Sequence, residues 1–487
     1  MKKSSSAVLM CTALLTVSYF SHSQTIHSDT TLNQASTKLL PRVRVAGKAY
    51  SSASIVERMQ DTHLPGLSVA VLKDGQLKWA QGFGIANKEH NTQVTTQTLF
   101  QAGSISKPMA ALAALKLVAE GKLALDTNIN QYLTSWQIPK NAFTQQQPVT
   151  LRQLLTHTSG LSQHGFPGYE RSASIPGDVA VLNGGGNTDK VVVNSLPGQS
   201  WRYSGGGYTV MELLVQDVSK MPFSQYMQQH ILLPLGMTNS TYAQPLPKSH
   251  WSQASAAFDG NGEQIKGDWH VYPEQAAAGL WTTPSDLTKY ITAVQRARAG
   301  TSTGPITPEL VNQMLEIHHD TWGLGPELKQ HKQGLVFFHG GKNKGFTNYL
   351  EAYADKGDGI VIMANGDAAG PVIGELRIAL SELYDWDFKA AKEVKPVALT
   401  KALRSGLPGV YKYEQDDNFK MKVSVADEQI RILDMWRNND MEFVASDEKT
   451  LVWLESGTEV DIEHDSHGDV AAIVWAGEYR FVKAANE

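Results

Sequence analysis

Cysteine is almost absent from this sequence of 487 residues. The single one, Cys11, lies in a mostly apolar stretch, residues 7–20, that follows the basic start Met1-Lys2-Lys3. With Ser21-His22-Ser23 behind it as a small-x-small cleavage site, this arrangement is typical of a secretory signal. We therefore expect residues 1–23 to be a signal peptide and the mature chain to be periplasmic or secreted. That mature chain has no disulfide, no cysteine nucleophile and no thiolate metal site.

An excess of positive charge is also missing. The formal net charge is −5 at pH 7, and loss of Lys2 and Lys3 with the signal makes it more negative, which argues against nucleic acid as a partner. No uncharged apolar run reaches the roughly 20 residues of a membrane span. His157 and the pair His318-His319 lack metal-ligand spacing, so we interpret them as structural or surface residues. The sequence thus predicts no membrane span, no metal and no organic cofactor.

Hydrophobic patterns divide residues 51–390 into strands and helices. Residues 66–72 and 76–81 flank Asp74-Gly75, which predicts a hairpin. Residues 104–120 carry few charges, which predicts a buried helix. Further helices are expected at 150–156, 208–218, 222–233, from 283 onward and at 373–383, and further strands at 334–338, 349–353 and 359–364. This order predicts an α+β domain, in which an antiparallel sheet flanked by helices is built from both ends of the domain and a helical lobe is inserted.

The flanking segments differ in character. Residues 24–50 are polar and form an expected lead-in, and residues 391–406 form an expected linker. Between residues 407 and 487, short alternating runs separated by polar turns predict a small all-β domain, either a barrel or a sandwich. Seven runs are visible, at 420–425, 429–433, 442–445, 451–454, 459–463, 470–475 and 479–482.

The first motif with chemical potential is Ser104-Ile105-Ser106-Lys107, at the start of the expected buried helix. Positions i and i+3 share a helix face, so the Lys107 amine can reach the Ser104 hydroxyl. A buried lysine can lose its proton and activate a serine. Ser-x-x-Lys also occurs by chance in many chains. A lysine inside an apolar helix strengthens the catalytic interpretation, because an unpaired buried charge is costly.

Two further motifs are rich in glycine. Tyr203-Ser204-Gly205-Gly206-Gly207-Tyr208 could bring bare backbone close to a ligand, and Tyr203 could shuttle a proton if cationic neighbours lower its pKa. A glycine-rich turn before a helix explains the same glycines, and for this motif taken alone it is the better interpretation. His339-Gly340-Gly341 ends an expected strand, where backbone N–H groups can face an oxyanion. As a metal ligand, His339 has no partner at ligand spacing.

Together the three motifs resemble those of the serine β-lactamase and DD-peptidase superfamily, whose pattern is Ser-x-x-Lys, Tyr-x-Asn and a Lys- or His-x-Gly triplet on the third strand. Residues 64–72, 100–104, 154–161 and 278–287 resemble these proteins as well. The resemblance covers about residues 50–385 and implies a β-lactamase/transpeptidase-like catalytic domain. The C-terminal domain resembles the lipocalin-like appendages of some relatives. Capping of the active site, ligand binding and oligomerisation stay open as its roles.

The resemblance also implies roles for individual residues. Ser104 is the nucleophile that becomes acylated, Lys107 and Tyr203 handle the proton, His339, Gly340, Gly341 and Gly205 bind substrate, and the backbone N–H groups of Ser104 and Lys342 form the oxyanion hole. Two positions depart from the pattern. Gly205 replaces an asparagine, and the triplet is not the Lys-Thr-Gly typical of class C β-lactamases. Both changes weaken recognition of a β-lactam carboxylate and favour the D-aminopeptidase and esterase branch.

Three functions are compatible with these observations. The leading one is an exported serine hydrolase that forms an acyl-enzyme on Ser104 and cleaves a small peptide, amide or ester. A class C-type β-lactamase is the alternative within the same chemistry. A non-catalytic penicillin-binding or sensor protein is the third, and intact Ser104, Lys107 and Tyr203 argue against it. In each case the expected partner is a small molecule.

Overall fold

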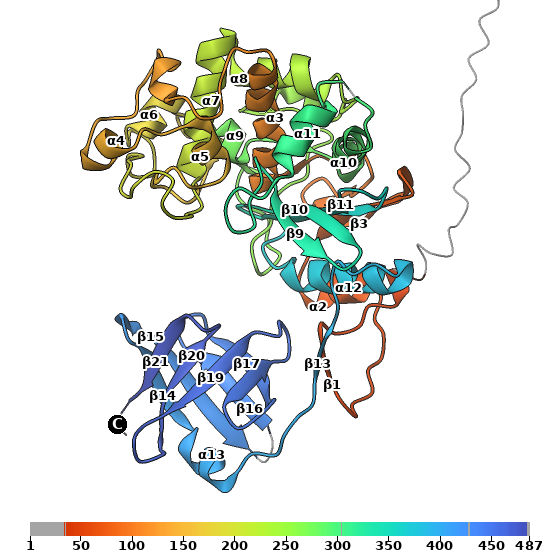
Figure 1. The fold of residues 1–487 in the computed structure, drawn as a ribbon. Coiled ribbons are helices and arrows are strands. Elements are labelled where there is room, and N and C mark those ends of the chain that lie inside the picture. The colour runs from red at the N-terminus through yellow and green to blue at the C-terminus, as the bar shows by residue number, and fades with distance from the viewer. Residues whose placement is uncertain (1–33, 35, 303, 427–428, 485–487) are drawn as a thin grey trace, which may run out of the picture.

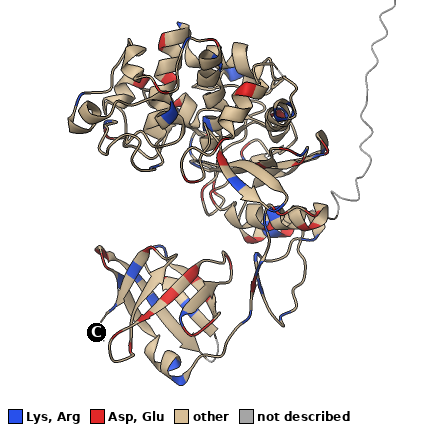
Figure 2. Ribbon diagram, in the orientation of Figure 1, with Lys and Arg blue, Asp and Glu red and all other residues tan. Residues whose placement is uncertain are grey.

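The computed structural model describes residues 34, 36–302, 304–426 and 429–484, so the predicted signal peptide lies outside the described residues. Figure 1 shows a larger domain of sheet and helices and, beyond α2 Ile55–Asp61 and α12 Gly370–Tyr384, a separate β-barrel. Acidic and basic residues are mixed over both parts in Figure 2. Among the described residues, no helix combines the length and the apolar character needed to cross a bilayer.

The larger domain is built on a seven-stranded sheet with the strand order β4-β3-β2-β12-β11-β10-β9. All neighbouring strands are antiparallel, and β2 from the start of the domain pairs with β12 from its end, as predicted. The strands are β2 Gly66–Lys73, β3 Gln76–Asn87, β4 Thr92–Gln93, β9 Glu327–His331, β10 Gly334–Asn343, β11 Phe346–Tyr353 and β12 Gly359–Ala364.

Helices cover both faces of this sheet. On one face lie α2 Ile55–Asp61 and α12 Gly370–Tyr384, joined by the ion pair of Arg58 with Glu375 at 2.8 Å. Alternate residues of β12 enter two different cores, Ile360 and Ile362 on the side of α2 and α12, Val361 and Met363 on the other. Burial on both faces explains why this strand is apolar throughout.

The helical lobe packs around α3 Ser106–Ala119, which is buried over most of its surface, as its low charge predicts. The chain enters the lobe after β4 and leaves it before β9. Its other helices are α4 Ala142–Gln146, α5 Leu151–Leu155, α6 Asp178–Leu182, α7 Gly205–Ser219, α8 Phe223–Met227, the π-helix η3 Gln228–Leu232, α9 Gln275–Ala278, α10 Pro284–Arg298 and α11 Pro308–Met314. Short 3-10 turns lie at η1 Gly103–Ile105, η2 Ile129–Gln131 and η4 Lys248–His250, and two small sheets pair β5 Phe100–Gln101 with β8 Trp281–Thr282 and β6 Tyr169–Glu170 with β7 His270–Val271.

The C-terminal domain is a closed barrel of eight strands, which decides between the barrel and the sandwich. Seven strands coincide with the predicted runs, and the eighth, β14 Gly409–Tyr413, closes the barrel between β15 and β21. The other strands are β15 Asp416–Ala426, β16 Gln429–Asp434, β17 Asn439–Ala445, β18 Thr450–Trp453, β19 Glu459–His464, β20 Val470–Trp475 and β21 Tyr479–Lys483.

Part of the expected lead-in and linker forms regular structure. β1 Val43–Val45 pairs in parallel with β13 Lys392–Val394, and α13 Lys401–Gly406 precedes the barrel. Val43 and Val394 pack on Val452 of the barrel, and Lys392 donates to Glu459 at 2.6 Å. The two short strands therefore connect the two domains through packing as well as through the chain.

Candidate active site

Ser104 lies in η1, a single 3-10 turn that leads directly into α3. Gly103, just before it, has a φ of +56°, a conformation that glycine adopts without steric cost. Ser104 is half-buried and stands at the start of the helix, as predicted. The partial positive charge of a helix N-terminus favours negative charge that develops at this place.

Lys107 follows one turn later, and it is only 2% exposed. Its Nζ lies 3.0 Å from Ser104 Oγ and donates to the backbone oxygen of Ala277 at 2.8 Å. Both partners are uncharged, and burial lowers the pKa of Lys107 to about 7. Near neutral pH, a large share of Lys107 is therefore a free amine that can take the proton of Ser104.

Tyr203 lies beside Ser104, and its hydroxyl is close enough to interact with the serine side chain. Lys107 Nζ lies 4.8 Å from the centre of the Tyr203 ring. Burial raises the pKa of the phenol, so the expectation that cationic neighbours lower it is wrong. The physical reason is that the nearest cation is itself buried and partly neutral. Tyr203 keeps its proton near neutral pH and is suited to relay or donate it.

Strand β10 carries the third motif beside the serine. Its side chains alternate, so His339 and Gly341 are buried whereas Gly340 and Lys342 are exposed. On the exposed face, Lys342 Nζ pairs with Asp367 at 2.9 Å. The Lys342 ammonium is therefore compensated on the face of β10 opposite to His339, and it does not replace the cation that the triplet lacks.

Two glycines let this strand approach the serine turn. A Cβ on Gly341 would overlap the carbonyl oxygen of Ala102, and a Cβ on Gly103 would lie 2.5 Å from the backbone nitrogen of Lys342. Only glycine is compatible with such a separation of the two backbones. As a result, the backbone nitrogen of Lys342 lies beside the turn that carries Ser104.

His339 is neutral in this site. Burial lowers the pKa of His339 to about 3, with a further contribution from the nearby Lys107. Its Nδ1 lies 2.6 Å from the carbonyl oxygen of Gly340, and its ring packs against Trp322 at 5.6 Å and Tyr203 at 6.3 Å between centroids. The position therefore offers a neutral ring, as the sequence suggests, in aromatic surroundings that the sequence does not reveal.

The second glycine-rich motif is not an open loop. Gly205, Gly206 and Gly207 form the first turn of α7, which Ser204 caps by accepting from Gly207 N at 2.9 Å. None of the three has a positive φ. They serve close packing, since a Cβ on Gly206 would lie 2.8 Å from the backbone oxygen of Ser162. The glycines thus form the helix start that the sequence offered as the plain alternative, and Gly205 provides no side-chain amide at its position.

Comparison with known proteins agrees with this arrangement. The β-lactamase family model matches residues 52–382, which is most of the chain. The chain belongs to the β-lactamase family. This confirms the resemblance to the serine β-lactamase and DD-peptidase superfamily and the α+β fold inferred from it.

Among curated relatives, the Staphylococcus aureus MW2 "Protein flp" is 24% identical over 330 residues, which are 64% of this chain and 62% of the relative. A putative penicillin-binding protein, PbpX of Bacillus subtilis 168, is 29% identical over 191 residues, which are 39% of this chain and 45% of the relative. The chain thus spans about three fifths or less of the length of these relatives.

Solved structures share the fold. The octameric penicillin-binding protein homologue from Pyrococcus abyssi has a TM-score of 0.59 at 22% identity, over 88% of this chain and 98% of its own. SurE with D-Leu has a TM-score of 0.56 at 18% identity, over 88% and 97%. Both structures cover 88% of this chain, which is more than the family match over residues 52–382. The structural likeness therefore includes part of the C-terminal domain.

One buried carboxylic acid of this β-lactamase-family chain escapes the sequence analysis. Glu212, on α7, is fully buried, and its Oε2 accepts from Ala276 N at 2.8 Å at the start of α9. The same short helix supplies the Ala277 oxygen that holds Lys107. Burial, reinforced by Asp178, raises the pKa of Glu212 well above its usual value, which favours the neutral form of the acid. The available signal was an acid in the middle of an apolar helix.

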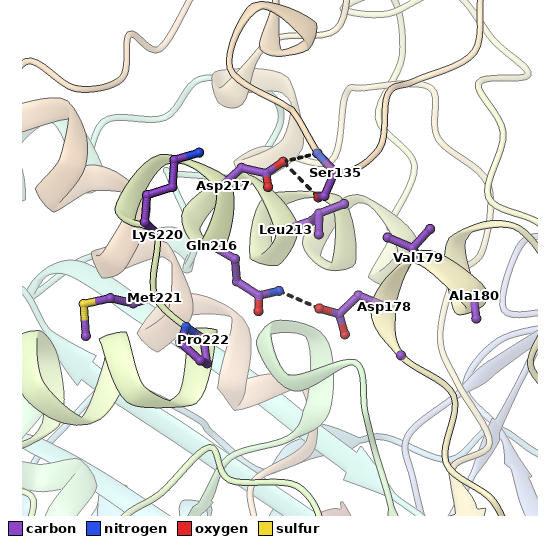
Figure 3. Close-up of a pocket in the computed structure, with 11 residues that line it drawn as sticks. Ser135, Asp178, Val179, Ala180, Leu213, Gln216, Asp217, Lys220, Met221 and Pro222 are labelled. Atoms are coloured by element: carbon purple, nitrogen blue, oxygen red, sulfur yellow. Dashed lines mark hydrogen bonds between the residues drawn. The ribbon is translucent and has the colours of Figure 1, made fainter.

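A second feature, the pocket in Figure 3, is separate from the serine. It measures about 430 Å³, lies against α6 and α7, and includes none of the predicted site residues. Its acids already have partners: Asp217 accepts from Ser135, and Asp178 accepts from Gln216. Within the described residues, no group of three or more His, Cys, Asp or Glu side chains could hold a metal ion.

The two glycines of the triplet should respond differently to alanine. Gly341→Ala places a methyl group against the Ala102 carbonyl, which should cost about 1–3 kcal/mol and slow acylation of Ser104. Gly340→Ala is the matched control, because its Cβ would have Tyr349 Cδ2, at 3.9 Å, as its nearest neighbour. Thermal unfolding and the rate of labelling by a fluorophosphonate check this. Equal behaviour of the two variants would contradict the proposed close packing.

Glu212 should tolerate an amide and not an apolar side chain. Glu212→Gln keeps the acceptor for Ala276 N and the neutral charge, whereas Glu212→Met leaves that buried N–H unpaired, at about 1–3 kcal/mol. We expect a lower thermal midpoint and slower acylation only for the methionine variant. Glu274→Gln serves as control, since the Glu274 carboxyl is buried beside the same helix and neither of its oxygens accepts a hydrogen bond among the described residues. Loss of acylation in Glu212→Gln would disprove a neutral acid at this position.

Proposed function

We propose that this chain is a serine hydrolase that forms an acyl-enzyme on Ser104 and cleaves a small peptide, amide or ester. The observation that carries the proposal is the distance of 3.0 Å between Ser104 Oγ and a buried amine whose pKa is lowered to about 7. A base poised near the working pH is what activation of a serine hydroxyl requires. Membership of the β-lactamase family supports this assignment.

The proposed reaction has two stages. Ser104 Oγ bonds to the substrate carbonyl carbon while its proton passes to the Lys107 amine. The negative oxygen that results is stabilised by the backbone N–H groups of Ser104 and Lys342. Tyr203 donates a proton to the leaving group as the scissile bond breaks. Lys107 then transfers the proton taken from Ser104 to Tyr203. Water then attacks the carbonyl carbon of the Ser104 ester, its proton passes through Lys107 and Tyr203 to Ser104 Oγ as the ester bond breaks, and the acid product leaves.

The lack of a cation favours small neutral acyl groups over anionic β-lactams. His339 is neutral, the Lys342 ammonium is paired with Asp367, and Gly205 provides no amide. SurE, a structural neighbour, was determined with D-Leu, which supports a peptide or amide of a D-amino acid among the candidate substrates. We further propose that residues 51–390 form the hydrolase domain and that export follows cleavage after Ser23.

A β-lactamase is the second candidate, supported by the family to which the chain belongs. The two candidates share the acylation chemistry and differ in what holds the substrate. The non-catalytic sensor is not supported, because Ser104, Lys107 and Tyr203 lie together in contact.

Acylation should follow the protonation of Lys107. Only the free amine can accept the proton of Ser104, so the rate of fluorophosphonate labelling should rise with pH through about 7 and then level off. His339, with its pKa of about 3, should add no second step between pH 5 and 9. Ser104→Ala should abolish labelling while the thermal midpoint stays near that of the parent. Labelling that persists in this variant would refute Ser104 as the nucleophile.

Substrate preference should separate the two candidates. Each missing charge-assisted hydrogen bond is worth roughly 1.5–3 kcal/mol, so nitrocefin turnover should be on the order of 10² to 10⁴ less efficient than that of a β-lactamase with both contacts. Short-chain p-nitrophenyl esters and D-aminoacyl p-nitroanilides should be hydrolysed clearly, as measured by kcat/KM. Efficient nitrocefin hydrolysis without esterase or amidase activity would establish the β-lactamase instead.

A further inference from the structure

One end of the C-terminal barrel opens into a cavity that is remote from the serine in the sequence and the fold. The cavity measures about 420 Å³, and every strand of the barrel except β19 contributes to its lining. Its mouth lies at the turns that join β14 to β15, β16 to β17 and β20 to β21. At the other end, Leu399, Leu403 and Leu407 from and around α13 fill the core. The cavity is therefore a cup, closed below and around its sides.

Aromatic rings form most of this cup. They are Tyr413, Phe419, Trp436, Trp453, Trp475, Tyr479 and Phe481. The Trp436 and Phe481 rings are nearly parallel, with 8° between their planes and 6.3 Å between their centroids, and Trp453 and Trp475 lie 5.8 Å apart. Met421 and Met441 complete the apolar wall. Such a surface offers flat faces and adaptable thioethers to an apolar guest.

Two of the aromatic side chains at the mouth face solvent to an unusual degree for their size. Phe419 is 38% exposed and Tyr479 is 43% exposed. Water in contact with these rings would be released on binding, which favours association with an apolar molecule. A volume of about 420 Å³ falls within the range of roughly 300–1,000 Å³ that small-molecule sites occupy. The size and the closed walls fit a small molecule and not a helix or strand of a protein.

The charges of the cup determine the class of guest. Asp434 and Arg437 are the charged residues of its lining, and their side chains lie 3.9 Å apart. The Asp434 carboxylate already accepts from the backbone N–H groups of Trp436 and Arg437, at 3.2 and 3.1 Å. The Arg437 side chain is 74% exposed, so its charge stays in water outside the cup, whereas the buried Asp434 carboxylate is already held by the two backbone N–H groups. An anionic guest that enters the cup would lose hydration without gaining a counter-charge there.

We propose that the mouth of the barrel binds one neutral, predominantly aromatic or aliphatic small molecule. The lining includes none of Ser104, Lys107, Tyr203 and His339, so this site is distinct from the proposed hydrolase site. The barrel is then a binding module attached to an enzyme domain.

The test uses the full chain and two fluorescent probes that share the same aromatic body. N-phenyl-1-naphthylamine is neutral, and 1-anilinonaphthalene-8-sulfonate carries a sulfonate. The neutral probe should bind saturably at one site per chain. The sulfonate should bind at least about tenfold more weakly, because its charge finds no partner. Equal or tighter binding of the sulfonate would overturn the assignment to neutral ligands.

Two variants locate the probe. Met441→Trp fills the cup from its wall and should abolish binding. Phe419→Ala trims an exposed ring and should weaken binding about fivefold while the fold stays intact. Trp251→Ala is the matched control, since it removes a similarly exposed ring from the other domain. Unchanged binding in Phe419→Ala and Met441→Trp would overturn the proposal, as would the absence of saturable binding in the folded parent.

The same samples separate this proposal from the enzymatic one. Phe419→Ala should be labelled on Ser104 by a fluorophosphonate at the parent rate, and Ser104→Ala should bind the neutral probe like the parent. Probe binding that declines as the protein concentration rises, together with dimers in sedimentation, would show that a second copy occupies the mouth. That result would overturn the small-molecule site and leave the hydrolase intact.

Discussion

The burial of the Lys107 amine among uncharged partners is the constraint on which the site depends. An ammonium in this place would need a counter-charge, and the neighbouring groups are a hydroxyl, a peptide carbonyl and aromatic rings. The low pKa of Lys107 follows from this, and with it the capacity to accept a proton from Ser104. The surrounding helices are arranged accordingly: α3 carries the amine, α7 follows Tyr203, and α9 supplies the carbonyl that directs Nζ.

A second constraint acts on the backbone. β10 and η1 belong to segments more than two hundred residues apart in the sequence, and they meet through Gly103 and Gly341 with no room for a side chain. The sheet places β10 at this separation, because residues 336–343 of β10 pair with β11 and residues 334–338 pair with β9. The same close approach puts the Lys342 nitrogen near Ser104. In this site glycine therefore serves packing between two backbones, and in α7 it serves packing between a helix and a loop.

The two domains meet different physical demands. The larger domain buries polar and titratable groups around Ser104, with Lys107, His339 and Glu212 among them. The barrel has a continuous apolar core at the end near α13 and a ring of aromatic side chains, partly exposed to solvent, at its other end. β1 and β13 connect the two through a small valine cluster and the pair of Lys392 with Glu459. If both proposals hold, the chain combines a reactive serine with a surface suited to apolar molecules.

The sequence by itself determined the local elements and the chemistry of the motifs. Alternation and turn residues located the strands, low charge identified α3 as buried, and Ser-x-x-Lys followed from the helical repeat that puts i and i+3 on one face. β14 was not predicted, because its five residues show no clear alternation of buried and exposed side chains. Tertiary structure alone decided the pKa of Lys107, of His339 and of Tyr203. It also decided the helical state of Gly205 to Gly207, the pairing of Lys342 with Asp367 and the role of Glu212. The physical reason is that burial and neighbouring groups set the energy of a charge or a contact, and these neighbours come from distant parts of the chain.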